Sequence, residues 1–372
     1  MVDDDPVAQR SPGKLLVYTH ALSGGGAERV CAILASGFAQ RGWTVLLAVD
    51  RKSSDNAGYL DARVAQVVLG SGHLGSTLAL ARLLRREKPD ISYSAIGAAN
   101  LKHTIAALLA GRARRAIISY HAFAISEPQL LSRIGYRATP LLSRLTARTV
   151  AVSKSLRDDL LKHWRSAPNR TVAIHNPVVV GPDLDPLQPS IGTPPVVLAA
   201  GRLTPGKNMR ELVQAFARVA ERRPCALVIL GEGPERAALE ADIRALGLEG
   251  RVHLPGYVAK PWAFYRSAAC FVSASSAESF SMVVAEALTY GLPVVAVDCA
   301  GPREVLDEGR YGELVPAGIP EALADAIVRV LDAPGSAEPR RQRGASFSVD
   351  AGLDAYARLF REITGDPAAP EG

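Results

Sequence analysis

The sequence predicts an α/β chain of two domains, each built on a parallel β-sheet that helices cover on both faces. Short apolar runs alternate with helical patterns along nearly the whole chain, which is typical of parallel sheets. A length of 372 residues exceeds what one ordinary core holds and suits two domains of about 170–200 residues. Between the halves, residues 181–195 contain five prolines, as expected of a linker.

Each half has five expected strands. In the first half, a strand over 15–19 leads through a glycine-rich turn into a helix over 27–41, and further strands are expected at 45–49, 91–94, 116–119 and 150–152. In the second half the strands are expected at 196–200, 226–230, 252–254, 270–272 and 293–297. The chain then ends in an Arg-rich segment after Pro334, a helix over 349–363 and a tail at 365–372. The expected segments are a first domain over 1–180, a linker over 181–195, a second domain over 196–345, and a C-terminal helix and disordered tail over 346–372, the helix packing back towards the first domain.

The composition is that of a soluble globular protein, with 48% hydrophobic and 22% charged residues. No apolar run approaches the ~18–20 residues that span a bilayer. Asp3, Asp4 and Asp5 open a segment without the basic and apolar regions of a signal peptide. The four cysteines are scattered without metal-binding spacing and are expected to be buried free thiols. These features predict a cytoplasmic protein.

Charge is divided unevenly between the halves. Residues 1–180 hold 24 Lys and Arg against 12 Asp and Glu, a net charge of +12, while residues 181–372 have a net charge of −6. A basic half suggests an anionic partner, which could be a membrane surface, a phosphate-bearing acceptor or a nucleic acid. Because aromatic residues for base stacking make up only 6% of the chain, nucleic acid is not expected as a partner.

The glycine-rich turn at 23–29 lies between a strand and a helix, where backbone amides and the helix dipole favour an anion. A dinucleotide-binding fingerprint is the alternative, with Asp50 at the end of the next strand. In the turn at 23–29, Arg29 occupies the position of the third glycine of this fingerprint. In the turn at 231–236, Arg236 occupies the corresponding position. A bulky side chain there would block close packing of helix and strand, which disfavours a dehydrogenase.

The candidate functional residues of the second half are two glutamates and two basic residues. Glu278 precedes an expected helix, and Glu286 lies two turns further on among apolar neighbours, where a carboxylate is costly unless it meets hydrogen-bond donors. Sugar or ribose hydroxyls would supply such donors, although a solvated or salt-bridged glutamate is the alternative. Arg202 and Lys207 follow the first strand of this half, at the ligand edge of an α/β sheet, and suit a diphosphate.

Together these segments resemble glycosyltransferase family 4, whose members have the GT-B architecture of two Rossmann-like domains with parallel sheets facing a central cleft. The resemblance covers about residues 15–356. It is carried by GRLTPGKN at 201–208, LVILGEGPER at 227–236, VHLPGYV at 252–258 and ESFSMVVAEALTYGLPVVAVD at 278–298. In the first half it is supported by GGGAERV at 24–30, SYHA at 119–122 and AVSKSLRDDL at 151–160.

The resemblance implies roles for individual residues. Arg202 and Lys207 would bind the donor diphosphate, Glu286 the ribose hydroxyls, and Glu278 the donor sugar. The backbone amides near the phosphate would be those of Phe280, Ser281 and Met282. Gly233 and Val258 would lie beside the nucleobase. His121 would face the transferred sugar, and the turn at Gly25 and Gly26 would lie across the cleft near phosphate and acceptor. The other histidines, among them His20 and His175, are given no functional role.

The sequence departs from the family pattern in three places. Ser279 stands where the family often has glycine, but serine can still donate a hydrogen bond. The segment at 175–179 lacks the Asp that commonly follows its Asn-Pro-Val, and the loop at 299–304 has one glycine where a pair is common. An Asp-x-Asp that would hold a divalent cation occurs at 183–185 inside the linker. We therefore expect no metal, with Arg202, Lys207 and helix amides in its place.

Family membership implies retention of anomeric configuration, and fixed cations would lower the barrier to departure of the diphosphate. The expected donor is a UDP-hexose or UDP-N-acetylhexosamine, and the expected acceptor a glycan or a polyprenyl-linked glycan in bacterial surface polysaccharide synthesis. The alternatives are a non-hydrolysing sugar-nucleotide epimerase of similar fold and a basic nucleic-acid-binding module. A phosphorylase would need a pyridoxal lysine, for which no motif is present.

A basic amphipathic stretch at 130–148 suggests where an anionic membrane would bind. Its arginines are spaced by 4, 7 and 4 residues, which places them along one helical face, and apolar residues follow the same spacing beside them. The arginines are Arg133, Arg137, Arg144 and Arg148, and the apolar residues are Leu130, Ile134, Leu141 and Leu145. Pro140 should kink or divide the helix. A core-packed helix with a solvated basic edge is the alternative to a peripheral, cytoplasmic-face location.

Overall fold

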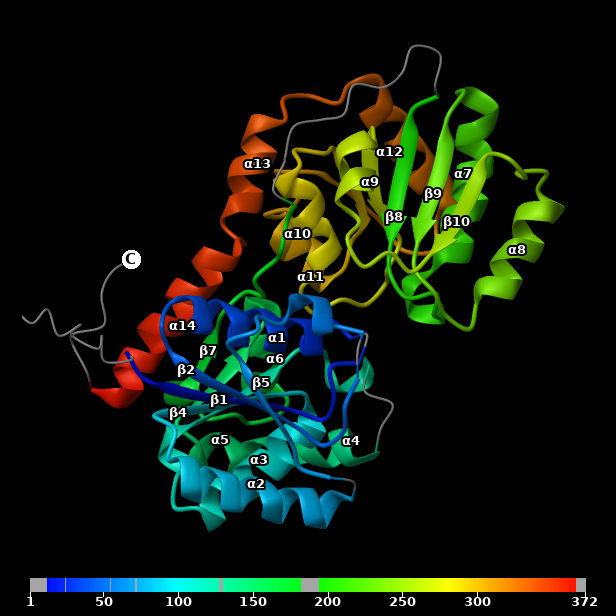
Figure 1. Cartoon of the computed structure of the whole chain (residues 1–372). Coiled ribbons are helices and arrows are strands. Elements are labelled where there is room, and N and C mark those ends of the chain that lie inside the picture. The colour runs from blue at the N-terminus through cyan, green and yellow to red at the C-terminus, as the bar shows by residue number, and fades with distance from the viewer. Residues whose placement is uncertain are drawn as a thin grey trace, which may run out of the picture. The chain divides into compact units, whose positions relative to one another are not determined.

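A computed structural model describes residues 12–23, 25–53, 55–70, 72–126, 130–181 and 194–365. Within these ranges the chain forms two compact α/β units, each with its own parallel sheet (Figure 1). The first unit takes in residues up to 151, 157–174 and from 353 on, and the second takes in 152–156 and 175–352. The prediction of two Rossmann-like α/β domains is confirmed.

The first sheet has the strand order β3-β2-β1-β4-β5-β6-β7, with all neighbouring strands parallel. Its strands are β1 (Lys14–Thr19), β2 (Thr44–Val49), β3 (Ala65–Val68), β4 (Ile91–Ala95), β5 (Ala116–Tyr120), β6 (Arg148–Ala151) and β7 (Thr171–Ala173). Its helices are α1 (Gly26–Gln40), α2 (His73–Glu87), α3 (Gly97–Leu109), α4 (Leu130–Arg137), α5 (Thr139–Leu145), α6 (Lys154–Lys162) and part of α14 (Val349–Thr364). Short 3-10 turns lie at Ala57–Tyr59, Ala113–Arg115, Ala124–Ser126 and Pro168–Arg170.

Successive side chains of β1 point to opposite faces of this sheet. Leu16 and Tyr18 join a buried cluster with Leu80 and Leu84 of α2 and with Ala106 of α3. On the opposite face lie α1 and α14, as Figure 1 shows. This double burial explains why β1 and β2 are recognisable as nearly continuous apolar runs.

The second sheet has the order β10-β9-β8-β11-β12-β13, also parallel. Its strands are β8 (Val196–Ala200), β9 (Ala226–Leu230), β10 (Val252–Gly256), β11 (Cys270–Ser273), β12 (Val294–Val297) and β13 (Glu313–Val315). Its helices are α7 (Met209–Arg222), α8 (Arg236–Ala245), α9 (Trp262–Ser267), α10 (Met282–Thr289), α11 (Ala300–Val305), α12 (Pro320–Asp332) and α13 (Glu338–Ala345), and a 3-10 turn spans Pro205–Lys207. Helices α7 and α12 cover one face of this sheet with Leu212, Phe216, Leu323 and Ile327, all fully buried.

Every expected strand is present, within one or two residues of the expected limits. The strands β3, β7 and β13 were not predicted. Each has only three or four residues and lies at the edge of its sheet, and β3 is exposed along most of its length. Such strands lack the apolar run by which a buried strand is recognised.

The compact units do not follow the expected domain limits residue by residue. The start of α6 belongs to the second unit because the Glu304 carboxylate accepts hydrogen bonds from the backbone amides of Lys154 (2.8 Å) and Ser155 (3.1 Å). Helix α14 belongs to the first unit from Leu353 on, where Phe360 stacks on Phe38 at a ring separation of 4.9 Å. Most of the expected linker, with Asp183 and Asp185, and the tail after residue 365 lie outside the described residues.

The stretch at 130–148 differs from the expected single basic face. The chain divides at Ala138 into α4 and α5, with Pro140 in the first turn of α5, where proline is tolerated. Arg148 lies in β6, half-buried, and pairs with Glu362 at 3.4 Å. The prediction that Arg148 continues the face of Arg133 and Arg144 is therefore wrong, because the second helix ends at Leu145.

The cysteines are all free: Cys31, Cys225 and Cys270 are buried, and Cys299 is half-buried. Across the residues that the structure describes, no helix combines the length and the hydropathy needed to cross a membrane.

Candidate active site

The candidate site of the second unit lies at the carboxyl edge of its sheet, where the loops after β8, β9, β11 and β12 gather. Because the strands are parallel, their carboxyl ends share one edge, which is the usual ligand edge of an α/β sheet. The predicted residues on these loops are Arg202, Lys207, Gly233, Glu278, Phe280 and Ser281. The structure therefore places these predicted residues at one edge of the sheet, as expected from the strands that they follow.

Backbone contact joins the loops after β8 and β9. The amide of Gly201 donates to the Leu230 carbonyl (2.9 Å), and that of Leu203 to the Glu232 carbonyl (2.9 Å). A side chain at Gly231, whose φ is +137°, would collide with the Gly201 carbonyl, and one at Gly233 would collide with the Leu203 backbone. Both glycines are thus required for the close approach of the two loops.

Arg236 fills the place of the missing third glycine and is fully engaged. Its guanidinium binds Glu232 at 2.7 Å, Glu240 at 2.9 Å and the Leu254 carbonyl at 3.0 Å. The side chain thus ties the start of α8 to the neighbouring strand β10. This explains why the turn departs from the dinucleotide fingerprint.

Lys207 and Glu278 are brought together from loops 71 positions apart in the chain. The Lys207 ammonium forms an ion pair with Oε1 of Glu278, both side chains being about one-fifth exposed. Arg202 is exposed at the same edge, directly after β8. The arrangement offers two cations, one of them held by a carboxylate, to an anionic ligand.

The segment from Glu278 to Ser281 is held by the loop after β12. The amide of Gly301 donates to the Glu278 carbonyl at 2.8 Å. A Cβ at Gly301 would come within 2.9 Å of the Phe280 backbone nitrogen, so the single glycine of this loop is needed for packing. Phe280 is buried and stacks on the ring of His175 with centroids 5.4 Å apart.

Ser281 ends this segment in the left-handed conformation, with φ of 52°, and α10 begins at Met282. The Ser281 hydroxyl is buried, and it has no hydrogen-bond partner among the residues that the structure describes. A polar atom without a partner is costly inside a protein. It therefore fits a site that a ligand completes.

Glu286 lies on α10 and is only 4% exposed, as its apolar neighbours predicted. Its carboxylate accepts a hydrogen bond from the Tyr265 hydroxyl at 2.9 Å. The ring of Tyr265 is itself clamped by stacking on Tyr290, at 5.4 Å and an interplanar angle of 6°. Sequence reasoning missed Tyr265, because nothing in the pattern of α9 indicates that this side chain reaches α10.

Val258 is half-buried in the loop after β10, beyond the bend at Gly256. Cys299 follows β12 and donates a weak hydrogen bond from Sγ to the Ser275 carbonyl at 3.3 Å. Burial, with a smaller contribution from the charge of Glu278, raises the pKa of the Cys299 thiol to about 11. The thiol is therefore uncharged at neutral pH and is no nucleophile there.

In the first unit, His121 directly follows β5 at the carboxyl edge of its sheet. Its Nε2 lies 3.0 Å from the Ser119 hydroxyl and 3.3 Å from the Tyr93 hydroxyl. Burial lowers the pKa of the imidazole to about 3, so His121 is neutral at physiological pH. Tyr93 in turn lies 3.5 Å, hydroxyl to hydroxyl, from Tyr356 of α14. A contribution of α14 to the surroundings of His121 was not foreseen.

The glycine-rich turn of the first unit leads into α1 as expected. Gly25 is the N-cap of α1 and Gly26 its first residue, while Gly24 lies outside the described residues. The turn is tied down by Asn56, whose side-chain amide donates to the Ser23 carbonyl at 2.8 Å. The amides of the first turn of α1 therefore lie at the same sheet edge as His121.

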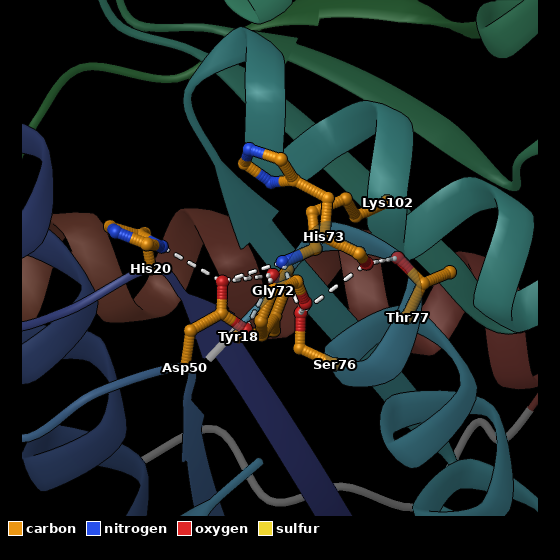
Figure 2. A network of polar contacts seen from close by, with 8 residues as sticks. All are labelled: Tyr18, His20, Asp50, Gly72, His73, Ser76, Thr77 and Lys102. Atoms are coloured by element: carbon orange, nitrogen blue, oxygen red, sulfur yellow. Dashed lines mark hydrogen bonds and ion pairs between the residues drawn. The ribbon is translucent and has the colours of Figure 1, made fainter. Parts of the chain in front are cut away.

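A dinucleotide fingerprint would require the Asp50 carboxylate to bind a ribose hydroxyl, but other side chains already engage it. Figure 2 shows it inside a polar network with Tyr18, His20 and Lys102. Among the described residues, no group of three or more His, Cys, Asp or Glu side chains is placed to hold a metal ion.

Two family models of known proteins match this chain. Residues 24–181 match the family model "Glycosyltransferase Family 4", and residues 185–346 match "Glycosyl transferases group 1". The chain is 32% identical, over 177 residues, to an alpha-D-kanosaminyltransferase of Streptomyces kanamyceticus, which is 45% of this chain and 46% of that protein.

It is also 30% identical, over 186 residues, to an N-acetylgalactosamine-N,N'-diacetylbacillosaminyl-diphospho-undecaprenol 4-alpha-N-acetylgalactosaminyltransferase of Campylobacter jejuni. That match covers 48% of this chain and 49% of the relative, so the chain spans about half the length of these two relatives.

A crystal structure of Anabaena Alr3699/HepE in complex with UDP has the same fold, with a TM-score of 0.79 at 22% identity. The structural match covers 94% of this chain and 100% of the HepE chain. Because the two family models together take in nearly the whole of both units, the chain belongs to the family 4 glycosyltransferases with the GT-B fold.

Proposed function

We propose that this protein transfers a hexose or N-acetylhexosamine from a UDP-sugar to a glycan or lipid-linked glycan, with retention of configuration, in bacterial glycoconjugate synthesis. The observation that carries the proposal is the edge of the second sheet. There the loops carry the Lys207–Glu278 ion pair, the buried Ser281 hydroxyl precedes α10, and the buried Glu286 lies within α10. Cations suit a diphosphate, and carboxylates suit sugar hydroxyls.

Each residue then has a chemical task. Arg202 and Lys207 would stabilise the negative charge that develops on the leaving diphosphate, helped by amides at the start of α10. Glu286, held by Tyr265, would accept hydrogen bonds from the ribose, and Glu278 from the donor sugar. Neutral His121 would contribute hydrogen bonding rather than charge. Gly233 and Val258 would border the base, and Gly25 and Gly26 the acceptor side.

The UDP-sugar and the acceptor are supported by relatives. The Campylobacter relative is named for a diphospho-undecaprenol substrate, and the HepE structure contains UDP. No metal is part of the proposal, because two side-chain cations already face the ligand edge. The proposed location is the cytoplasmic face of a membrane.

The experiment is a donor and acceptor screen with the full chain. Thermal unfolding is measured with UDP, GDP and ADP, since a ligand at 100 times its Kd adds ~2.7 kcal/mol. Transfer is then followed from UDP-glucose, UDP-galactose and UDP-N-acetylglucosamine to octyl β-D-glucopyranoside and to farnesyl-diphosphate-linked N-acetylglucosamine. We expect stabilisation by UDP above the others and an α-linked product by NMR. A free epimerised UDP-sugar without acceptor would instead identify an epimerase, and a β-linked product would contradict retention.

A membrane-facing surface on α4 and α5 is the second part of the proposal. Leu130, Ile134 and Leu141 are 72%, 42% and 60% exposed on these two consecutive helices. Exposed arginines accompany them at Arg133, Arg137 and Arg144. Apolar side chains beside arginines suit an anionic lipid surface, where each cation contributes about 1 kcal/mol.

Sedimentation with vesicles of phosphatidylglycerol and phosphatidylcholine tests this surface. Binding should fall as salt rises and in a variant with serine at positions 133, 137 and 144. A charge-matched control with serine in place of the exposed Arg244, Lys260 and Arg310 of the second unit should bind like the wild type. Equal recovery on neutral and anionic vesicles at low salt would refute the proposal.

A further inference from the structure

A buried carboxylate organises four side chains at the end of β2. Asp50 is 4% exposed and accepts hydrogen bonds from the Tyr18 hydroxyl (3.1 Å), His20 Nδ1 (2.8 Å) and Lys102 Nζ (2.6 Å). The Lys102 ammonium also donates to the Ser76 hydroxyl at 2.6 Å. Figure 2 shows Tyr18, His20 and Lys102 converging on the Asp50 carboxylate, with Ser76 of α2 beside Lys102.

Lys102 keeps Asp50 in its charged form. Burial alone would raise the pKa of the Asp50 carboxyl, but the hydrogen bonds from Lys102 and His20 outweigh burial and hold the pKa below its ordinary value. An ionised carboxylate can only accept hydrogen bonds, so the proton between the two groups resides on Nδ1 of His20. In the neutral imidazole, Nε2 then carries a lone pair and accepts a hydrogen bond.

His20 presents that lone pair away from the network. Its side chain is 56% exposed, and Figure 2 shows the second ring nitrogen on the side of the ring facing away from Asp50. The backbone is held as well, because the His20 carbonyl accepts the amides of Asp50 (3.0 Å) and Arg51 (3.2 Å). An exposed ring is thus fixed in position and in tautomer by buried groups.

Stability alone gives no reason for this arrangement. A buried ion pair such as Asp50–Lys102 costs desolvation energy and can often be replaced by apolar residues without loss. The residue it orients follows β1 at the carboxyl edge of the first sheet, the edge that also carries Gly25 and His121. Fixed polar groups at a ligand edge are what a binding site requires.

We propose that His20 Nε2 binds the acceptor by accepting a hydrogen bond from one of its sugar hydroxyls, and that Asp50 and Lys102 are positioning residues for this contact. The inference rests on the proposed glycosyl transfer to a glycan. In the tautomer with the proton on Nδ1 and a lone pair on Nε2, the ring selects a hydrogen-bond donor, which a sugar hydroxyl supplies and an ionised phosphate oxygen does not. Acceptor recognition in the first unit is thereby assigned to a residue other than His121 or the glycine-rich turn.

The test separates acceptor binding from donor chemistry in the full chain. For His20→Phe, His20→Gln and the control His163→Phe, an exposed histidine elsewhere in the first unit, three quantities are measured. They are UDP affinity, UDP-glucose hydrolysis without acceptor, and the acceptor KM for octyl β-D-glucopyranoside and farnesyl-diphosphate-linked N-acetylglucosamine. We expect His20→Phe to raise the acceptor KM about three- to tenfold, the scale of one hydrogen bond, with UDP affinity and hydrolysis unchanged.

His20→Gln, which keeps an oxygen that can accept a hydrogen bond, should raise the acceptor KM less than His20→Phe does. His163→Phe should leave the acceptor KM unchanged. Unchanged acceptor KM in His20→Phe would overturn the inference, as would an equal loss of UDP affinity, which would place His20 at the donor. A wild-type chain that neither binds UDP nor releases it from UDP-glucose would refute the proposed function itself, a distinct result that also removes the basis of the inference.

Positioning is tested by removing both buried charges together. Asp50→Asn with Lys102→Met avoids leaving one charge unpaired and should raise the acceptor KM like His20→Phe, with little change in kcat. Long-range proton–nitrogen spectra of the chain labelled in its seven histidines give a readout free of activity. They should show His20 protonated at Nδ1, with an Nε2 signal that shifts as octyl β-D-glucopyranoside is added. The opposite tautomer, or an unmoved signal, would contradict the proposal.

Discussion

The Tyr265 hydroxyl donates a 2.9 Å hydrogen bond to the carboxylate of Glu286, joining the short helix α9 to α10 beneath the ligand edge of the second sheet. Burial of a carboxylate that is 4% exposed is costly unless it meets hydrogen-bond donors. Tyr265 is one such donor, and a ribose would be another. The bond therefore aims Glu286 before any ligand arrives.

Tyr265→Phe should weaken UDP binding by about 0.5–1.5 kcal/mol, the net value of one hydrogen bond, while the stacking on Tyr290 survives. Calorimetric titration with UDP measures the change. The control is Tyr257→Phe, which removes a hydroxyl from an exposed tyrosine of the same unit. Equal UDP affinity in Tyr265→Phe and wild type would mean that the bond serves only the packing of α9.

Glu286→Gln should cost more, roughly 1.5–3 kcal/mol of nucleotide-sugar affinity, because it removes a charge-assisted hydrogen bond. Calorimetry with UDP-glucose is the measurement, with circular dichroism to verify the fold. Since Gln can still bond to Tyr265, the fold should persist. Unaltered affinity would remove Glu286 from the donor site.

Activity should survive excess chelator, since Arg202 and Lys207 would take the place of a metal at the diphosphate. Initial rates of transfer from UDP-glucose are compared in EDTA, in Mg²⁺ and in Mn²⁺. Loss of turnover in EDTA that Mg²⁺ or Mn²⁺ restores would show that the diphosphate needs a cation that these side chains do not replace.

Glu304 predicts a pH dependence of stability. Its carboxylate accepts hydrogen bonds from His175 at 2.7 Å and from two amides at the start of α6. Burial opposes the charge, but these bonds outweigh it and lower the pKa from 4.5 to about 2. Because the pKa of Glu304 is lower in the folded state than in the unfolded state, its charged carboxylate stabilises the fold above pH 4.5. This stabilisation is lost as the pH falls from 4.5 towards 2.

Urea unfolding of wild type and Glu304→Gln at pH 7 and pH 3 measures this contribution. The variant should be less stable by about 1–3 kcal/mol at pH 7, and the difference should shrink at pH 3. Glu308→Gln, a change at an exposed glutamate nearby, is the control. A difference that stays constant between the two pH values would show that the charge of Glu304 does not act through this pKa.

Residues whose surroundings are local in sequence were predicted well. Glu286 was expected to be buried because its immediate neighbours on the helix are apolar, and it is. Arg202 and Lys207 were expected at the ligand edge because they follow a strand, and they lie there. The division of the stretch at 130–148 was expected from Pro140, whereas the position of Arg148 in β6 depended on where the helix ends.

Partners far apart in the chain could not be predicted. Nothing in the apolar periodicity pairs Tyr265 with Glu286, Glu304 with the start of α6, or His20 with Asp50 and Lys102, which lie 30 and 82 positions further on. The strands β3, β7 and β13 were missed for a related reason, since a short edge strand is defined by its neighbour and not by its own residues.

The sequence by itself determined the class of fold, the succession of the buried strands along the chain and the sheet edge at which the candidate residues lie, because each of these depends on apolar periodicity and on the loop that follows a strand. The tertiary structure alone decided which donors meet which carboxylates. Hydrogen bonds and ion pairs form over about 3 Å in space, and that distance is set only when the sheets have brought remote segments together. His20 shows the difference: an ordinary histidine in the sequence, it becomes an oriented hydrogen-bond acceptor once Asp50 lies beside it.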